Sequence, residues 1–126
     1  MATIRDVMSA GIVTVDPDST VAQAATIMAE KRIGSALVLE GEDLAGIFTE
    51  RDIVRALSQD FDAPGHPIAH WMTRNPTTVS PDATVEAAMD LMLEGGFRHL
   101  PVIDDGRVVG VVSIRDLAGA EAEAGG

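Results

Sequence analysis

The chain has 126 residues, carries a formal net charge of −11, and contains no cysteine. Its length suits one shared hydrophobic core better than two independent domains of usual size. The absence of cysteine excludes disulfides, thiolate chemistry and cysteine-based zinc sites, and the acidic balance argues against partners such as nucleic acid or an anionic membrane.

Targeting signals are not evident in the sequence. The N-terminus lacks the basic and apolar regions of a secretory signal, and no apolar run approaches the roughly 20 residues that span a bilayer. We therefore expect a soluble protein of the cytoplasm. Hydrophobic residues make up 46% of the chain and aromatic residues only 3%, so the core is predicted to be aliphatic.

The first half of the chain predicts elements in the order β-α-β-β-α. Thr20 and Gln23 have the spacing of a helix capping box, and Gly34 is expected to lie just past the end of that helix. The two later strands are predicted to pair as a hairpin across Gly41-Glu42-Asp43. In chain order, the predicted elements cover residues 12–15, 21–32, 36–39, 44–48 and 50–57.

The second half predicts the same elements again. The segment between the halves is rich in Pro, Gly and Asp, which is typical of a linker. The chain ends in Glu, Ala and Gly, which indicates an acidic flexible tail. We therefore divide the chain into a first repeat, a linker, a second repeat and a tail, over residues 1–61, 62–70, 71–120 and 121–126.

A duplication explains this symmetry. With an offset of 64 residues, 7–54 aligns without gaps on 71–118. One repeat alone has a small core, so the two are expected to pack about a pseudo-two-fold axis and to create two related clefts. Identical pairs include Met8/Met72, Thr14/Thr78, Pro17/Pro81, Thr20/Thr84, Met28/Met92, Gly46/Gly110, Arg51/Arg115 and Asp52/Asp116.

One motif closes the hairpin of each repeat. It reads Gly46-Ile47-Phe48-Thr49-Glu50-Arg51-Asp52 in the first repeat and Gly110-Val111-Val112-Ser113-Ile114-Arg115-Asp116 in the second. A glycine precedes two apolar strand residues, and a hydroxyl residue then opens a helix that has Arg and Asp in its first turn.

Two interpretations of this motif remain open. The hydroxyl and Asp have the spacing of a helix capping pair, which is purely structural. The same geometry also suits a ligand, because free N–H groups, a hydroxyl and an Arg at a helix start bind phosphate, and a carboxylate one turn later can accept both hydroxyls of a ribose. The occurrence of the complete set in both repeats favours the ligand.

The chain resembles a tandem CBS-domain pair, also called a Bateman module, from about Val7 to Leu117. The resemblance lies in the Gly-h-h-[Thr/Ser]-x-x-Asp motif, where h is apolar, in the turn-to-helix segments 14–21 and 78–85, and in the segment 99–104. It implies an α/β (α+β) fold of two β-α-β-β-α repeats. It also implies a regulatory module that senses adenosine-based ligands, with AMP, ADP or ATP expected and NAD or S-adenosylmethionine possible, and no required cofactor.

The resemblance also implies two sites in clefts between the repeats. Site A takes Val13, Ile33, Gly34, Arg98, His99, Ser113, Arg115 and Asp116. Site B takes Ser35, Thr49, Arg51, Asp52, Thr77 and Phe97. The two Asp residues are expected to hold ribose, the hydroxyl residues and the two Arg of the motif to lie near phosphate, and residues of the opposite repeat to sandwich adenine.

The repeats differ at one entrance of the implied sites. Arg98 and His99 match family positions that often meet phosphate, whereas the first repeat has Gly34 and Ser35 there. We therefore expect the two sites to be unequal. The resemblance further implies a homodimer, and a module of this kind passes its signal to an unidentified protein target or acts through its own assembly.

Other functions receive less support. The chain has no nucleophile elbow and no Walker loop, so we expect no enzymatic activity. His66 and His70 have the spacing of a metal pair, but Pro67 lies between them, and we interpret them as solvated linker residues without a metal. The alternative to a sensor is a scaffold or protein-interaction module whose clefts stay empty.

Overall fold

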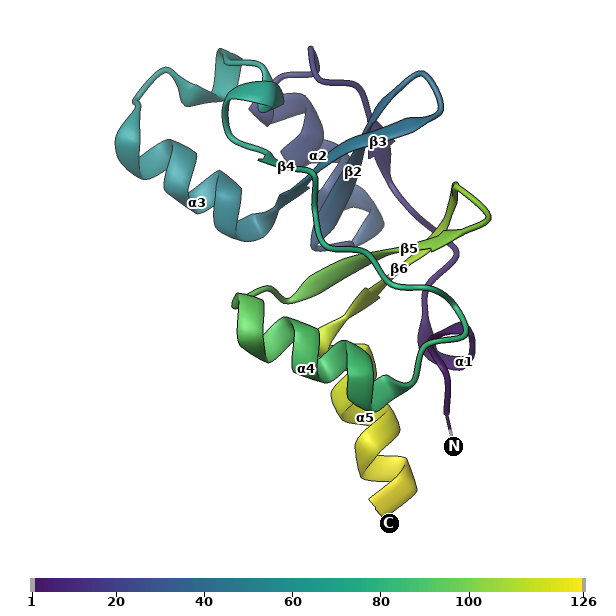
Figure 1. Ribbon diagram of the computed structural model, residues 1–126. Coiled ribbons are helices and arrows are strands. Elements are labelled where there is room, and N and C mark those ends of the chain that lie inside the picture. Colours follow the sequence, from purple (N-terminus) through teal and green to yellow (C-terminus); the bar gives the residue numbers. More distant parts are fainter. Residues whose placement is uncertain (1, 126) are drawn as a thin grey trace. The chain divides into compact units, whose positions relative to one another are not determined.

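The computed structural model describes residues 2–125 and divides the chain into two compact units (Figure 1). The first-repeat unit is Ile12–Pro76, and the second-repeat unit combines Met1–Gly11 with Thr77–Gly126. This division differs from the sequential one predicted above. The N-terminal segment belongs to the second repeat, and the predicted linker belongs to the first.

The first-repeat unit is a four-stranded sheet with two α-helices. Strand order is β1-β2-β3-β4, with β1 parallel to β2 and the other neighbours antiparallel. The α/β class and the order β-α-β-β-α are confirmed. The elements are β1 (Thr14–Val15), α2 (Val21–Lys31), β2 (Ser35–Glu40), β3 (Asp43–Thr49), α3 (Glu50–Gln59), the 3₁₀ turns η1 (Ala63–Gly65) and η2 (Ile68–His70), and β4 (Thr73–Arg74).

The second-repeat unit repeats this plan with less regular edges. Its hairpin pairs β5 and β6 antiparallel. A single parallel bridge between Val79 and Val102 stands where β1 pairs with β2, and an antiparallel bridge between Ser9 and Val111 stands where β4 pairs with β3. The elements are α1 (Ile4–Val7), α4 (Val85–Gly95), β5 (His99–Asp104), β6 (Arg107–Ser113) and α5 (Ile114–Gly125).

The start of α2 has the capping box predicted from the sequence, whereas the end of α2 differs from the prediction. The capping box is confirmed, since the Gln23 backbone N–H donates to Thr20 Oγ1 at 3.1 Å and the Thr20 N–H donates to Gln23 Oε1 at 2.9 Å. The residue in the left-handed conformation that ends the helix is Arg32, with φ 56°, and not Gly34. The equivalent position in the second repeat is Gly96, with φ 72°, where a glycine adopts that conformation without strain.

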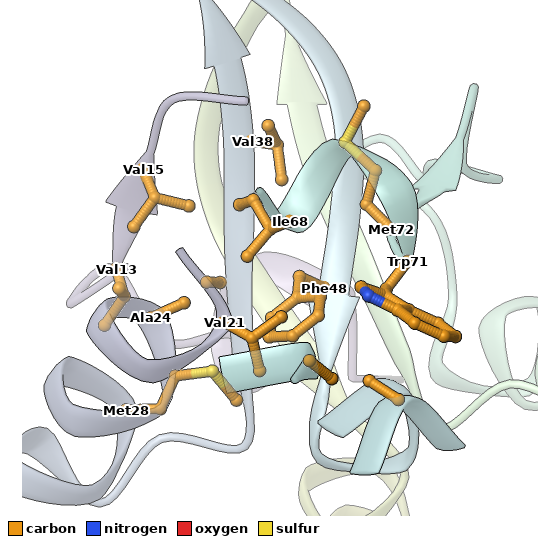
Figure 2. Close-up of a cluster of buried hydrophobic side chains, with 13 residues drawn as sticks. Val13, Val15, Val21, Ala24, Met28, Val38, Phe48, Ile68, Trp71 and Met72 are labelled. Carbon is orange, nitrogen blue, oxygen red and sulfur yellow. The ribbon is translucent and has the colours of Figure 1, made fainter. Parts of the chain in front are cut away.

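The first-repeat core is mostly aliphatic, as predicted, with Phe48 fully buried among β-strand and helix residues (Figure 2). Ala63 and Ile68 are also fully buried in it. The segment 62–70 therefore packs as part of this unit, and its Pro and Gly residues form 3₁₀ turns instead of a loose linker. The Ile68 N–H donates to the Ser19 carbonyl at 2.8 Å, which fixes the segment beside the start of α2.

The N-terminal segment completes the second-repeat core in the same way. Ile4 is fully buried with Leu100, Val112 and Leu117. Its backbone N–H donates to the Ala83 carbonyl at 2.9 Å. Without this segment, the apolar surface of β6 and α5 would be exposed to water.

The glycine of the repeated motif has a packing role. A Cβ at Gly46 would lie 2.6 Å from the Thr73 carbonyl oxygen, and a Cβ at Gly110 would lie 2.7 Å from the Ser9 carbonyl oxygen. Both distances are shorter than any real contact, so only glycine lets the neighbouring strand segment approach this closely. From the sequence alone, this packing role could not be distinguished from a functional one.

The C-terminal helix extends beyond the predicted second repeat. The bounds of α5, Ile114–Gly125, include most of the segment that the composition predicted to be a flexible tail. Within the part of the chain that the structure describes, no helix has the length and apolar character needed to cross a membrane.

Candidate functional site

The motif of the first repeat forms a strand-to-helix junction. Thr49 ends β3 and is the N-cap residue of α3. Ser35, at the start of β2, pairs with Thr49 in the antiparallel register. The Glu50 N–H donates to the Gly34 carbonyl at 3.2 Å. Gly34 and Ser35 therefore lie beside the N-terminus of α3, although only Ser35 was assigned to the site of this junction and Gly34 was assigned to site A.

The carboxylate of Asp52 caps this helix. Its Oδ2 accepts hydrogen bonds from the Thr49 backbone N–H at 2.9 Å and from Thr49 Oγ1 at 3.3 Å. The capping interpretation of the motif is therefore confirmed in geometry. Asp52 is only 6% exposed, so both its position and its protonation are constrained by the fold.

Arg55 was missed by the sequence reasoning. Its Nη2 lies 3.3 Å from Asp52 Oδ1 and donates to the Trp71 carbonyl at 2.7 Å. The spacing of Asp and Arg three residues apart on a helix could have indicated the ion pair. The contact with Trp71 could not have been found, because it depends on how the segment after α3 folds back.

Burial and pairing oppose each other at Asp52. Burial raises the pKa of this carboxyl above its ordinary value, and the hydrogen bond from the Thr49 N–H together with the Arg55 charge counteracts part of that rise. The net pKa is raised. A raised carboxyl pKa in a polar junction is a feature of functional sites as well as of buried ion pairs.

Ser35 contributes a polar atom that needs a partner. The residue is 2% exposed, and among the residues that the structure describes its Oγ has no hydrogen bond. Buried hydroxyls without a partner are rare in folded proteins because each one loses its hydrogen bonds to water. The first-repeat junction therefore contains an unsatisfied hydroxyl beside a helix N-terminus.

The second repeat forms the equivalent junction. The Ser113 N–H donates to Asp116 Oδ2 at 2.9 Å, and the Asp116 N–H donates to Ser113 Oγ at 3.2 Å. His99 pairs with Ser113 in the sheet register. The Ile114 N–H donates to the Arg98 carbonyl at 2.8 Å. Asp116 is half-buried, and Arg98 is exposed.

The residues of each predicted site are divided between the two units. For site A, the polar members Arg98, His99, Ser113, Arg115 and Asp116 share the second-repeat unit, and Val13, Ile33 and Gly34 lie in the first. For site B, the polar members Ser35, Thr49, Arg51 and Asp52 share the first-repeat unit, and Thr77 and Phe97 lie in the second.

A separate pocket of about 360 Å³ lies within the first-repeat unit, between α2 and the start of α3. Of the predicted site residues it contains only Ile33, and Glu50 of the junction also lines it. Its lining is Ala25, Met28, Ala29, Arg32, Ile33, Glu50 and Ile53.

The histidine pair lies outside the junctions. The ring centroids of His66 and His70 are 5.8 Å apart, and His66 Nδ1 is 3.7 Å from Asp60 Oδ2. Among the described residues, no group of three or more His, Asp or Glu side chains is arranged to hold a metal ion.

The duplicated architecture recurs in known proteins. An uncharacterized 17.7 kDa protein of Acidianus ambivalens is 43% identical over 124 residues, which cover 95% of this chain and 74% of that protein. The crystal structure of the CBS domain pair of protein MJ0100, in complex with 5′-methylthioadenosine and S-adenosyl-L-methionine, superposes with a TM-score of 0.90 at 28% identity and covers 98% of both chains.

A second solved structure is similar over its full length. The crystal structure of CBSX2 in complex with AMP has a TM-score of 0.83 at 25% identity and covers 100% of both chains. The family model of the CBS domain matches this chain twice, over residues 4–59 and 68–123. Both matches end in the helix that follows a repeated junction, and the chain therefore belongs to the CBS-domain family as a tandem pair.

Proposed function

We propose that the chain binds adenosine-based nucleotides at its two strand-to-helix junctions and acts as a regulatory sensor, not as an enzyme. The observation that carries the proposal is the junction itself, which presents a hydroxyl, a carboxylate and an Arg at a helix start in both repeats. The structural neighbours are in complex with AMP, 5′-methylthioadenosine and S-adenosyl-L-methionine, and all three ligands contain adenosine.

Each polar group of the junction has a role in this proposal. Asp52 and Asp116 accept hydrogen bonds from ribose hydroxyls. The hydroxyl and Arg beside each carboxylate bind phosphate at the N-terminus of the helix. Arg98 and His99 add phosphate contacts at site A only. The unsatisfied Ser35 hydroxyl gains a ligand partner at site B.

The adenine ring would be held by residues of the other repeat. For site A these are Val13, Ile33 and Gly34, and for site B they are Thr77 and Phe97. AMP, ADP and ATP are the ligands we expect, and NAD and S-adenosylmethionine share the same adenosine. No further cofactor is needed. A sensor of this kind transmits its state to a protein target or through its own assembly.

A thermal-shift panel tests the proposal. AMP, ADP, ATP, NAD and S-adenosylmethionine are added at increasing concentration, and the unfolding temperature is followed. We expect dissociation constants between micromolar and millimolar, about −8 to −4 kcal/mol. A ligand at 100 times its Kd stabilises the fold by about 2.7 kcal/mol. An unfolding temperature that none of the five ligands moves would refute the sensor and favour an empty scaffold.

A homodimer is part of the proposal. Val54 and Leu57 lie one turn apart on α3 and Phe61 follows the helix, and their exposed fractions are 68%, 52% and 98%. Exposed apolar side chains at this spacing fit a helix of a second copy. Sedimentation equilibrium should give a dimer mass that Phe61→Asp reduces, whereas a monomer mass at every concentration would refute self-association.

A further inference from the structure

The two motif carboxylates have different neighbours within their own units. Asp52 Oδ2 accepts two hydrogen bonds, from the Thr49 N–H and from Thr49 Oγ1, and its Oδ1 forms an ion pair with the Arg55 guanidinium at 3.3 Å. For Asp116, the structure of residues 2–125 gives one donor, the Ser113 N–H on Oδ2. The duplication places Gly119 where the first repeat has Arg55, so the second repeat lacks the side chain that would pair with Oδ1.

The donors already bound to each carboxylate limit how many further hydrogen bonds that carboxylate can accept from a ligand. An ionised carboxylate has about four acceptor positions on its two oxygens. On Asp52 the two Thr49 donors occupy about two positions and the Arg55 guanidinium lies against Oδ1, so about one position remains. Asp116 has used about one, and about three remain. A ribose that donates both of its hydroxyls needs two positions, which Asp116 offers and Asp52 does not.

Arg55 is held in place and is not a loose surface charge. Its second contact, with the Trp71 carbonyl at 2.7 Å, fixes the guanidinium beside Asp52. The side chain of Asp52 is 8% exposed, whereas that of Arg55 is 49% exposed. A carboxylate this deeply buried loses much if its cation leaves, so an incoming hydroxyl does not simply replace Arg55.

We propose that Arg55 sets the sugar specificity of the first-repeat site, because it leaves Asp52 able to accept one ribose hydroxyl whereas Asp116 accepts both. This inference rests on the proposed adenosine binding and deepens it. The first-repeat site then tolerates the loss of one ribose hydroxyl, and the second-repeat site tolerates the loss of neither.

Calorimetry with three nucleotides tests this difference. The probes are AMP, 2′-deoxy-AMP and 3′-deoxy-AMP. Asp116→Ala removes the ribose contact of the second-repeat site, and Asp52→Ala removes that of the first. The backbone amide shifts of Thr49 and Ser113 in the same titrations assign the binding at each site. We expect the protein with Asp52→Ala to bind both deoxy nucleotides about tenfold or more weakly than AMP. With Asp116→Ala, the first-repeat site should bind one deoxy nucleotide about tenfold or more weakly than AMP and should bind the other about as tightly as AMP.

A substitution at Arg55 should give the first-repeat site the same sensitivity to both deoxy nucleotides that we expect of the second-repeat site. Met keeps a long unbranched side chain without donors, so Arg55→Met in the Asp116→Ala background frees a position on Asp52. Both deoxy nucleotides should then bind about tenfold or more weakly than AMP. Arg74→Met in the same background is the matched control, since it removes the same charge from an exposed position of the same unit and should leave the pattern unchanged.

The outcomes separate this inference from the proposed function. If the unsubstituted protein binds no AMP, both fall. If AMP binds but Asp116→Ala protein rejects both deoxy nucleotides, or shows no AMP binding while Asp52→Ala protein binds, only the inference about Arg55 falls. An unchanged pattern with Arg55→Met also overturns it. The comparison of the two Asp variants needs no change at Arg55, so the proposal stays testable if Arg55→Met does not fold.

A ligand-free measurement checks the ion pair itself. Carbon NMR of the Asp52 carboxyl follows its titration in the unsubstituted protein and with Arg55→Met. Loss of the cation should raise the pKa of Asp52 further, because the Arg55 charge favours the ionised form. An unchanged titration would show that the pair does not form in solution and would overturn the proposal.

Discussion

The two repeats carry one motif in two different environments. In the first repeat, the motif carboxylate Asp52 is buried and paired with Arg55. In the second, Asp116 is half-buried, and a glycine stands where that cation would be. The backbone cap is the same in both. The same Asp in the motif therefore does not make the same site in both repeats. The residue one helical turn later, Arg55 or Gly119, changes how many hydrogen bonds the carboxylate can accept from a ligand.

The largest expected difference between the repeats lies in their cores. Phe48 and its equivalent Val112 are both fully buried. Phe48→Ala should lower the free energy of unfolding by about 3–5 kcal/mol, because it removes a large apolar side chain and leaves a cavity. Val112→Ala deletes far less volume and should cost less. Urea unfolding measures both, and equal losses would contradict the packing described for the first-repeat core.

The second difference lies at the entrance of the sites. Arg98 and His99 supply donors that Gly34 and Ser35 cannot, so site A should bind AMP more tightly than site B. Two charge-assisted bonds separate the sites by about 2–3 kcal/mol, which is about 30- to 150-fold in affinity. Calorimetric titration of the unsubstituted protein and of Arg98→Ala/His99→Ala tests this. Equal affinities at both sites, or an isotherm that the double substitution leaves unchanged, would contradict the asymmetry.

The third difference separates the two interpretations of the motif. Asp116→Ala should weaken AMP binding by about 1.5–3 kcal/mol through the lost ribose contact, and should lower the free energy of unfolding by about 1 kcal/mol through the lost cap. Calorimetry and urea unfolding give the two values. A loss of stability with unchanged affinity for the ligand would show that the residue is a cap and nothing more.

The smallest expected difference is a pH dependence that belongs to Asp52. Its pKa in the folded protein is raised above the ordinary value of 3.8. The folded state therefore holds the proton more tightly than the unfolded chain, and the Asp52 contribution to stability falls as pH rises from about 3.8 through the raised value. Urea unfolding from pH 3 to pH 7 should show this fall relative to Asp52→Asn. A stability difference between the two proteins that rises with pH would have the wrong sign.

Much of the fold could be predicted because its signals are local. The β-α-β-β-α order and the Thr20–Gln23 cap follow from apolar spacing and from short-range hydrogen bonds. The division of the chain could not be predicted, since it depends on the long-range packing of Ile4 and Ile68 into cores distant in sequence. Arg32 shows a further limit, because it adopts the left-handed conformation at the end of α2, whereas the sequence pointed to Gly34 as the residue just past that end.

The candidate site was predictable in its polar residues and not in their environment. The repeated spacing of hydroxyl and Asp was enough to place both caps. It gave no information about the burial of Asp52, the unsatisfied Ser35 hydroxyl or the contact of Arg55 with the Trp71 carbonyl. These features depend on the tertiary packing around the junction, and the contact of Arg55 in particular forms only when the segment after α3 folds back.

Backbone amide shifts during an AMP titration show whether the nucleotide binds at the two strand-to-helix junctions. The amides of Thr49 and Glu50 report on the first-repeat junction, and those of Ser113 and Ile114 report on the second. We expect saturable shifts at both junctions, with the second junction responding at lower AMP concentration. Shifts confined to residues away from both junctions, or no shifts at millimolar AMP, would contradict nucleotide binding at the repeated motif.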